Sequence, residues 1–192
     1  QRAARQEYQQ ARKEAFADLG NQARSYQKAA DSHIASMNAE ANGLDPYGDM
    51  PSPEELLPKL DAEASKAIAE SGLGPAEFWK TDAGRELERS FVRRVQTNKE
   101  QYGEIEDAYT ELDQLQTDLA HNTESPAEKR ELLPQVREAA ERLRDADGVP
   151  DEAKAACDKI IAEVDAAKQA MKQYRNVRKE MKAIREPAED QE

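Results

Sequence analysis

The chain has 192 residues, of which 35% are charged and 5% are aromatic, and its formal net charge at pH 7 is −12. This composition is typical of long, well-solvated helices, and no window alternates β-branched or aromatic residues with polar ones, so we expect an all-α fold. The acidic charge disfavours binding to nucleic acid or to an anionic membrane surface, because both are polyanions. Apolar runs never exceed four residues, so no transmembrane segment is expected in this chain.

The first long helix is predicted over residues 1–41. Its apolar face repeats every three or four residues and consists of Phe16, Leu19, Ala23, Tyr26, Ala30, His33 and Met37. The segment NGLDPYGDMPS at 42–52 concentrates Gly, Pro and Asp, which favour turns. We therefore expect the main loop of the molecule there.

A shorter second helix is predicted to begin at Ser52 and Pro53, because a Ser hydroxyl caps free backbone amides and Pro suits the first helical position. It is expected to end at Ser71, before Gly72. A short turn then carries Phe78 and Trp79. These two aromatic residues are predicted either to close the end of a bundle or to form an exposed anchor for a partner.

The second long helix is predicted over residues 83–121. Its core face is Phe91, Val95, Asn98, Tyr102, Ile105, Tyr109, Leu112, Gln116 and Leu119. Asn98 and Gln116 are polar members of this face, and buried polar residues in an apolar seam specify the register of helix packing. A second short helix is predicted from SPAE at 125–128, a capping-box sequence, to near Gly148.

The final helix is predicted over 150–186, followed by a disordered tail at 187–192. Its heptad-spaced face is Cys157, Ile160, Val164, Ala167, Met171, Tyr174, Arg178 and Met181. Together the patterns predict a single domain at 1–186. Its architecture would be an elongated helical bundle, with coiled-coil packing, of three long and two short helices.

Part of the sequence is repeated. The segment ELLPKLDAEASKAIAESGL at 55–73 resembles ELLPQVREAAERLRDADGV at 131–149. A tandem duplication of a long-short helix unit would give repeats at 1–73 and 77–149, because one such unit cannot cover its own apolar stripe and a second unit stacked on it can. The alternative is that Ala-rich and Glu-rich helices resemble each other by composition alone.

Residues suited to catalysis or metal binding are few. His33 lies on a core face, His121 lies at a helix end, and the lone Asp-x-x-His motif ending at His121 lacks the partner motif of a di-iron bundle. Cys157 is expected to be a buried, inert thiol. We therefore expect no enzymatic activity, no metal and no cofactor.

Two charged stripes stand out on the long helices. An acidic stripe follows one face of 83–121, and a basic stripe follows one face of 150–186. The acidic residues are Glu100, Glu104, Asp107, Glu111 and Asp118, and the basic residues are Lys168, Lys172, Arg175, Lys179 and Lys182. The stripes are predicted to select neighbouring helices within the bundle. Alternatively, the basic stripe recruits an acidic protein partner.

The preferred interpretation is a non-enzymatic scaffold or protein-protein interaction module, with self-association through a long helix as a further expectation. Gln1 is not an initiator Met, which favours an exported protein of the periplasm, cell envelope or cell surface. The alternative is an extracytoplasmic sensor or ligand-binding bundle of a membrane-anchored or lipid-anchored protein. Its ligand would enter between helices near Tyr26, Tyr102 and Tyr174.

Overall fold

The computed structural model describes residues 1–189, and in this range the chain forms six helices and no strand. The helices are α1 (Arg2–Asn42), α2 (Pro53–Ser71), α3 (Pro75–Phe78), α4 (Asp82–His121), α5 (Pro126–Asp145) and α6 (Asp151–Glu189). The predicted all-α fold is confirmed, with α3 as an extra single turn. Helix α6 continues three residues into the segment predicted to be a disordered tail, and residues 190–192 lie outside the described range.

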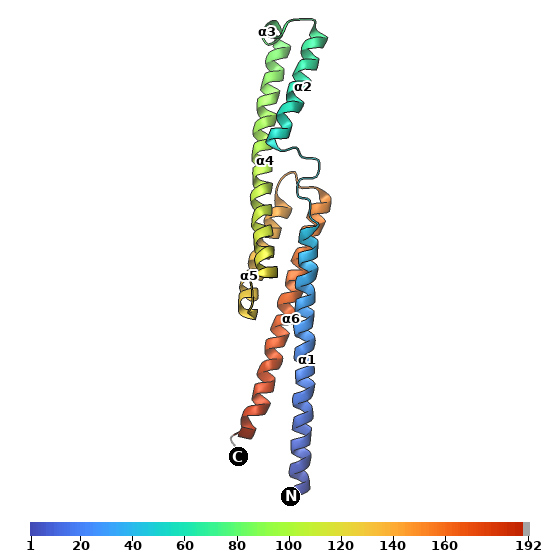
Figure 1. The fold of residues 1–192 in the computed structure, drawn as a ribbon, viewed down its shortest axis with the longest axis vertical. Coiled ribbons are helices and arrows are strands. Elements are labelled where there is room, and N and C mark those ends of the chain that lie inside the picture. Colours follow the sequence, from blue (N-terminus) through green and yellow to red (C-terminus); the bar gives the residue numbers. More distant parts are fainter. Residues whose placement is uncertain (190–192) are drawn as a thin grey trace.

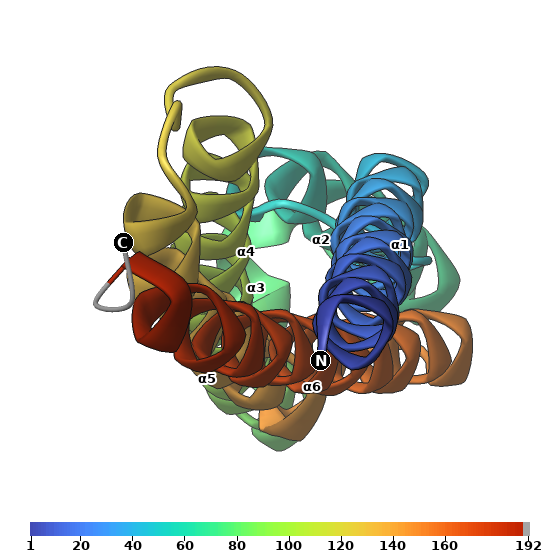
Figure 2. The same cartoon turned by 90° about the horizontal axis from the view of Figure 1, so that it is seen from below.

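The molecule is elongated and has two parts that share α4 (Figure 1). We call α1, α5, α6 and residues 99–121 of α4 the body, and α2, α3 and residues 82–98 of α4 the arm. In the body, α1 runs beside α6 along most of its length, and α5 packs between α4 and α6. Figure 2, which looks along the long axis, shows these four helices around a common centre.

The arm contains fewer packed helices than the body. Helix α2 packs on α4 and contacts α3, whereas α5 packs on both α4 and α6. Accordingly, α2 buries only two of its side chains, those of Leu56 and Leu60. Helix α5 buries five. The apolar pattern of α2 predicted a helix correctly, but it did not indicate that one long helix alone would cover it.

The apolar core lies in the body. Met37, Ile105, Leu133, Ile160 and Val164 are fully buried there, each with 0% of its surface exposed. On the predicted face of α1, Ala23, Ala30 and Met37 are buried and Tyr26 and His33 are half-buried. Phe16 remains 37% exposed, because α6 and α1 diverge towards the chain ends.

The polar residues predicted in the apolar seam of α4 are indeed buried. Asn98 and Gln116 are 9% and 5% exposed. The Asn98 side chain donates a hydrogen bond from Nδ2 to the carbonyl oxygen of Pro51, at 2.8 Å. This bond ties the main loop to α4 where the arm meets the body.

Local signals place the helix ends close to where the sequence predicts them. The Ser52 and Ser125 hydroxyls accept hydrogen bonds from the amides of Glu55 and Glu128, both at 3.2 Å. The capping box is shifted, since Glu128 accepts from the amide of Glu124 rather than from that of Ser125. The first helix starts without a side-chain cap at Gln1.

The two ELLP segments lie in α2 and α5 but use their leucines differently. Leu57 is 54% exposed, whereas Leu133, the matching residue, is fully buried. After the helices, Gly72 and Gly148 both have a positive φ, at 73° and 87°, which favours glycine. The duplication itself stays a prediction, because these shared ends do not distinguish common descent from common helix chemistry.

Three tyrosines pack at the joint between arm and body. Tyr47, from the main loop, stacks on Tyr102 with ring centroids 4.5 Å apart and meets Tyr109 edge-on at 6.4 Å. Burial, followed by the neighbouring Tyr102, raises the pKa of Tyr47 to about 12, and burial also raises the pKa of Tyr109. Both phenols are therefore held in their neutral form by the fold.

This joint predicts a loss of stability at alkaline pH. The folded pKa of Tyr47 is about 12 against an ordinary 10.0, so its contribution is complete below pH 10 and is lost as the pH rises towards 12. Tyr47→Phe keeps the ring but removes the ionisable hydroxyl group. Above pH 10, the melting temperature of this variant is therefore expected to fall less steeply with pH than that of the native chain. Tyr8→Phe, at an exposed position, is the control. Identical slopes for Tyr47→Phe and the native chain would contradict the prediction.

Candidate interaction surface

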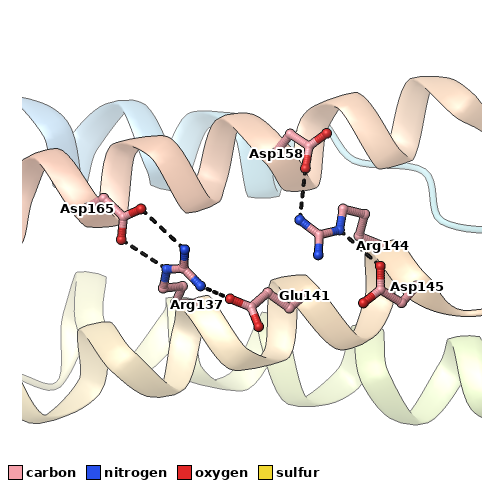
Figure 3. A network of polar contacts seen from close by, with 6 residues as sticks. All are labelled: Arg137, Glu141, Arg144, Asp145, Asp158 and Asp165. Carbon is pink, nitrogen blue, oxygen red and sulfur yellow. Dashed lines mark hydrogen bonds and ion pairs between the residues drawn. The ribbon is translucent and has the colours of Figure 1, made fainter.

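Two arginines of α5 hold this helix to α6. Arg137 pairs with Asp165 of α6 at 2.9 Å and with Glu141 of its own helix, and Arg144 pairs with Asp158 of α6 at 3.2 Å (Figure 3). Hydrogen bonds to Asp145 and Asp158 raise the pKa of Arg144. All these side chains are partly exposed, so each pair orients the helices more than it stabilises them.

The pairs belong to a regular row of charges between the two antiparallel helices. Arg144, Arg137 and Arg130 are spaced by seven along α5, and Asp158, Asp165 and Lys172 are spaced by seven along α6. We call this arrangement the charge row. Its first two positions are Arg144 with Asp158 and Arg137 with Asp165, so the same register sets Arg130 against Lys172. At this third position a cation faces a cation.

A groove of about 450 Å³ lies at this third position. It is lined by Arg130 of α5 and by Asp165, Lys168, Gln169, Met171, Lys172 and Arg175 of α6. Met171 is 9% exposed and belongs to the apolar core. The one carboxylate in the lining, Asp165, is already paired with Arg137. The groove therefore combines four cationic groups with an apolar surface and suits an anionic group carried by a partly apolar ligand.

The structure brings three residues of the predicted basic stripe into this groove, namely Lys168, Lys172 and Arg175. Lys179 and Lys182 lie exposed farther along α6 and do not line the groove. Arg130 was not predicted as part of the site, since it comes from another helix. Its spacing of seven from Arg137 and Arg144 was the available signal.

One residue of the acidic stripe of α4 pairs with a neighbouring helix. Glu111 pairs with Arg142 of α5 at 3.3 Å, and Asp118 accepts hydrogen bonds from Gln114 and Asn122. Glu100, Glu104 and Asp107 are exposed. Among the described side chains, no ion pair joins this stripe to Lys168, Lys172, Arg175 or Lys179 of α6. The pair of Glu111 with Arg142 agrees with a role in selecting a neighbouring helix, and for the other residues of the stripe that role stays a prediction.

Phe78 and Trp79 close the tip of the arm. The Phe78 side chain is 4% exposed and meets the half-buried Trp79 ring edge-on at 5.1 Å. Gly84 packs so closely under this turn that a β-carbon there would overlap the carbonyl oxygen of Phe78. This geometry favours the structural role of the pair over that of an exposed anchor.

The histidines and the thiol take structural positions. His33 Nδ1 lies 2.6 Å from Glu163 Oε2 on the flank of α1 and α6, and His121 is exposed at the end of α4. Cys157 is 0% exposed, and burial raises its pKa to about 11, which keeps the sulfur protonated. Over the described residues, no group of three or more His, Cys, Asp or Glu side chains is placed to hold a metal ion.

The tyrosines proposed to line a ligand site are not gathered in one place. Tyr102 stacks on Tyr47 at the joint. Tyr26 lies 16 residues before the end of α1, which corresponds to roughly 24 Å along the helix. On α6, Tyr174 lies between Glu163, which pairs with His33, and Met181, which lies next to Gly20. Tyr174 is therefore level with Tyr26 and away from Tyr102. Within the described helices, none is long and apolar enough to cross a bilayer.

Comparisons with known proteins found no similar protein. No family model, no curated protein and no solved structure matches this chain.

Proposed function

We propose that this chain is a non-enzymatic helical interaction module that binds an acidic segment of a protein partner in the groove between α5 and α6. The observation that carries the proposal is the third position of the charge row. Two positions pair Arg with Asp, and the third leaves Arg130 and Lys172 together at a groove with an apolar floor. A carboxylate from outside would complete the row, and Met171 would contact an adjacent apolar side chain.

The unpaired position is also a feature that folding alone does not explain. An acidic residue at 172 would extend the pairing seen at 158 and 165 and would relieve the repulsion between Arg130 and Lys172. Keeping a lysine there costs stability in the isolated chain. Such a cost is typical of a binding surface, where residues are placed for a ligand rather than for the fold.

The first test therefore needs no knowledge of the natural partner. Lys172→Asp is expected to raise the free energy of unfolding by about 0.5–1 kcal/mol at low salt, because the new carboxylate pairs with Arg130. Lys179→Asp is a matched control, since both positions have a cation four residues before and another three residues after them on α6. The measurement is chemical denaturation followed by circular dichroism. Equal effects of the two substitutions would contradict the proposed geometry of the row.

The second test measures binding directly with a panel of synthetic helical peptides that carry one Glu or Asp next to one Leu. The native chain is expected to bind such peptides more tightly than peptides with Gln in place of the acid. Lys172→Asp is expected to weaken that binding by about tenfold or more. The triple variant Lys59→Glu, Lys66→Glu and Lys80→Glu adds more negative charge, but on the arm, and is expected to leave binding nearly unchanged. Loss of binding in the arm variant alone would refute the groove as the binding site.

A further inference from the structure

The outward face of α4 carries a second organised set of charges. Seven charged side chains recur at intervals of three, four or seven residues and therefore share one face of this helix. They are Arg85, Arg89, Arg93, Glu100, Glu104, Asp107 and Glu111, and all are exposed. Val92 and Gln96 lie among them and are also exposed, Val92 at 51%. This face runs along both the arm and the body, since α4 is the helix that the two parts share (Figure 1).

The sign of the charge changes midway along this face. The arginines occupy the arm half together with Glu86, which lies five helical turns before Glu104 and so on the same line of the helix, and the acids occupy the body half. Of the seven residues, Glu111 is paired within the chain, with Arg142. The other six form no ion pair with any other described side chain, and Arg89 donates a hydrogen bond from Nε to the carbonyl oxygen of Arg85 at 3.3 Å. The face is thus an exposed dipole whose charges are largely uncompensated in one copy.

The charges of this face are complementary to those of the same face on a second, antiparallel α4. Arg93 and Glu100 lie at equal distances in sequence from the midpoint between Gln96 and Thr97, and so do Arg89 and Glu104. Arg85 and Asp107 match to within one residue, and Glu86, the counterpart of Asp107 about this midpoint, stands opposite another acid. We propose that two copies of this chain associate through this face, with their α4 helices antiparallel around a two-fold axis at that midpoint. Each arginine of one copy then faces an acid of the other, and the interface is closed by symmetry.

Gly103 provides independent support for a close approach at this face. A glycine in the interior of a helix makes the helix less stable than an alanine would, so its presence there calls for an explanation. Within the chain there is none, because a β-carbon at Gly103 would meet no atom within 4 Å. Gly103 lies on the proposed face, three residues after Glu100 and four before Asp107. A missing side chain there allows a second helix backbone to come closer.

This self-association does not rest on the proposed function, since the groove of α5 and α6 lies on a different helix pair. The occupant is a second copy rather than another protein because the order of charges on α4 matches its own reverse. A chain with a net charge of −12 would otherwise repel its own copy, so the local complementarity must act at short range.

The test is a charge-exchange experiment followed by sedimentation equilibrium. The native chain is expected to form a dimer at about 50 mM salt that weakens by about tenfold or more at about 500 mM, because screening shortens the reach of exposed charges. Arg89→Glu with Arg93→Glu makes the whole face acidic, and Glu100→Arg with Glu104→Arg makes it basic. Each double variant is expected to be monomeric. An equimolar mixture of the two is expected to form a heterodimer, since all four exchanged positions then face opposite charges.

The quadruple variant that combines both exchanges restores the reversed complementarity and is expected to form a homodimer again. All four positions are exposed, and circular dichroism checks that each variant keeps the native fold. A native chain that stays monomeric at low salt would overturn the proposal. So would a mixture of the two double variants that fails to associate. Self-association that survives Arg89→Glu with Arg93→Glu but is lost in Lys172→Asp would place the acids of α4 in the groove of a neighbour and would also overturn it.

Discussion

Leu133→Ala is expected to lower the free energy of unfolding by about 3–4 kcal/mol, whereas Leu57→Ala is expected to change it by less than about 0.5 kcal/mol. The two leucines occupy the same place in the two ELLP segments. Leu133 is fully buried between α5 and its neighbours, and its removal leaves a cavity in the body. Leu57 is 54% exposed on the arm, so its removal withdraws little apolar surface from contact.

Urea denaturation followed by far-ultraviolet circular dichroism measures both effects. Leu56→Ala serves as an internal reference, because Leu56 is 7% exposed and packs in the arm. Its loss is expected to be smaller than that of Leu133, since fewer side chains surround it. If Leu57→Ala were as damaging as Leu133→Ala, the two segments would be equally enclosed and the description of the arm as thinly covered would be wrong.

Gly84→Ala is expected to destabilise the arm by about 2–3 kcal/mol, because an added methyl group would overlap backbone atoms of the α3 turn. The turn cannot move aside cheaply. Thr81 fixes it, accepting a hydrogen bond from the amide of Gly84 at 3.1 Å and donating one to the carbonyl of Phe78 at 2.6 Å. We therefore expect Phe78 and Trp79 to be displaced.

Fluorescence gives a local readout of this change, because Trp79 is the only tryptophan in the chain and lies at the tip of the arm. The Trp79 transition is expected to shift to lower denaturant in Gly84→Ala, while most of the helical signal, which comes from the body, is retained. At about 500 mM salt, where the proposed dimer is weakened, Gly103→Ala on the same helix is a control with the opposite sign, because it is expected to raise the free energy of unfolding by about 0.5–1 kcal/mol. An unshifted Trp79 transition in Gly84→Ala would show that the turn adapts without cost.

The fold class and most helix ends could be predicted from the sequence because they depend on local chemistry. Ser52, Ser125 and Gly72 act on neighbouring backbone groups, so their roles are visible in a short window. The division into arm and body could not be predicted in this way. Periodicity identifies the apolar side of a helix, but the contrast between Leu57 and Leu133 depends on how many other helices reach that side.

The candidate site was predicted in part for the same reason. Lys168, Lys172 and Arg175 share one face of α6, which the spacing of three and four residues already indicates. The contribution of Arg130 depends on the register between α5 and α6, which the pairs of Arg137 with Asp165 and of Arg144 with Asp158 define. The exposure of Phe16 likewise depends on the divergence of α1 and α6, which no single helix encodes.

Helix α4 has a mechanical consequence for the molecule. Its 40 residues run without a break from the tip of the arm into the body, a length of roughly 60 Å. It contains no proline, the usual cause of a sharp bend in a helix. A force applied at the tip of the arm is therefore transmitted through continuous backbone hydrogen bonds, and α4 acts as a stiff rod that keeps this tip at a nearly constant distance from His121, at the other end of α4 in the body.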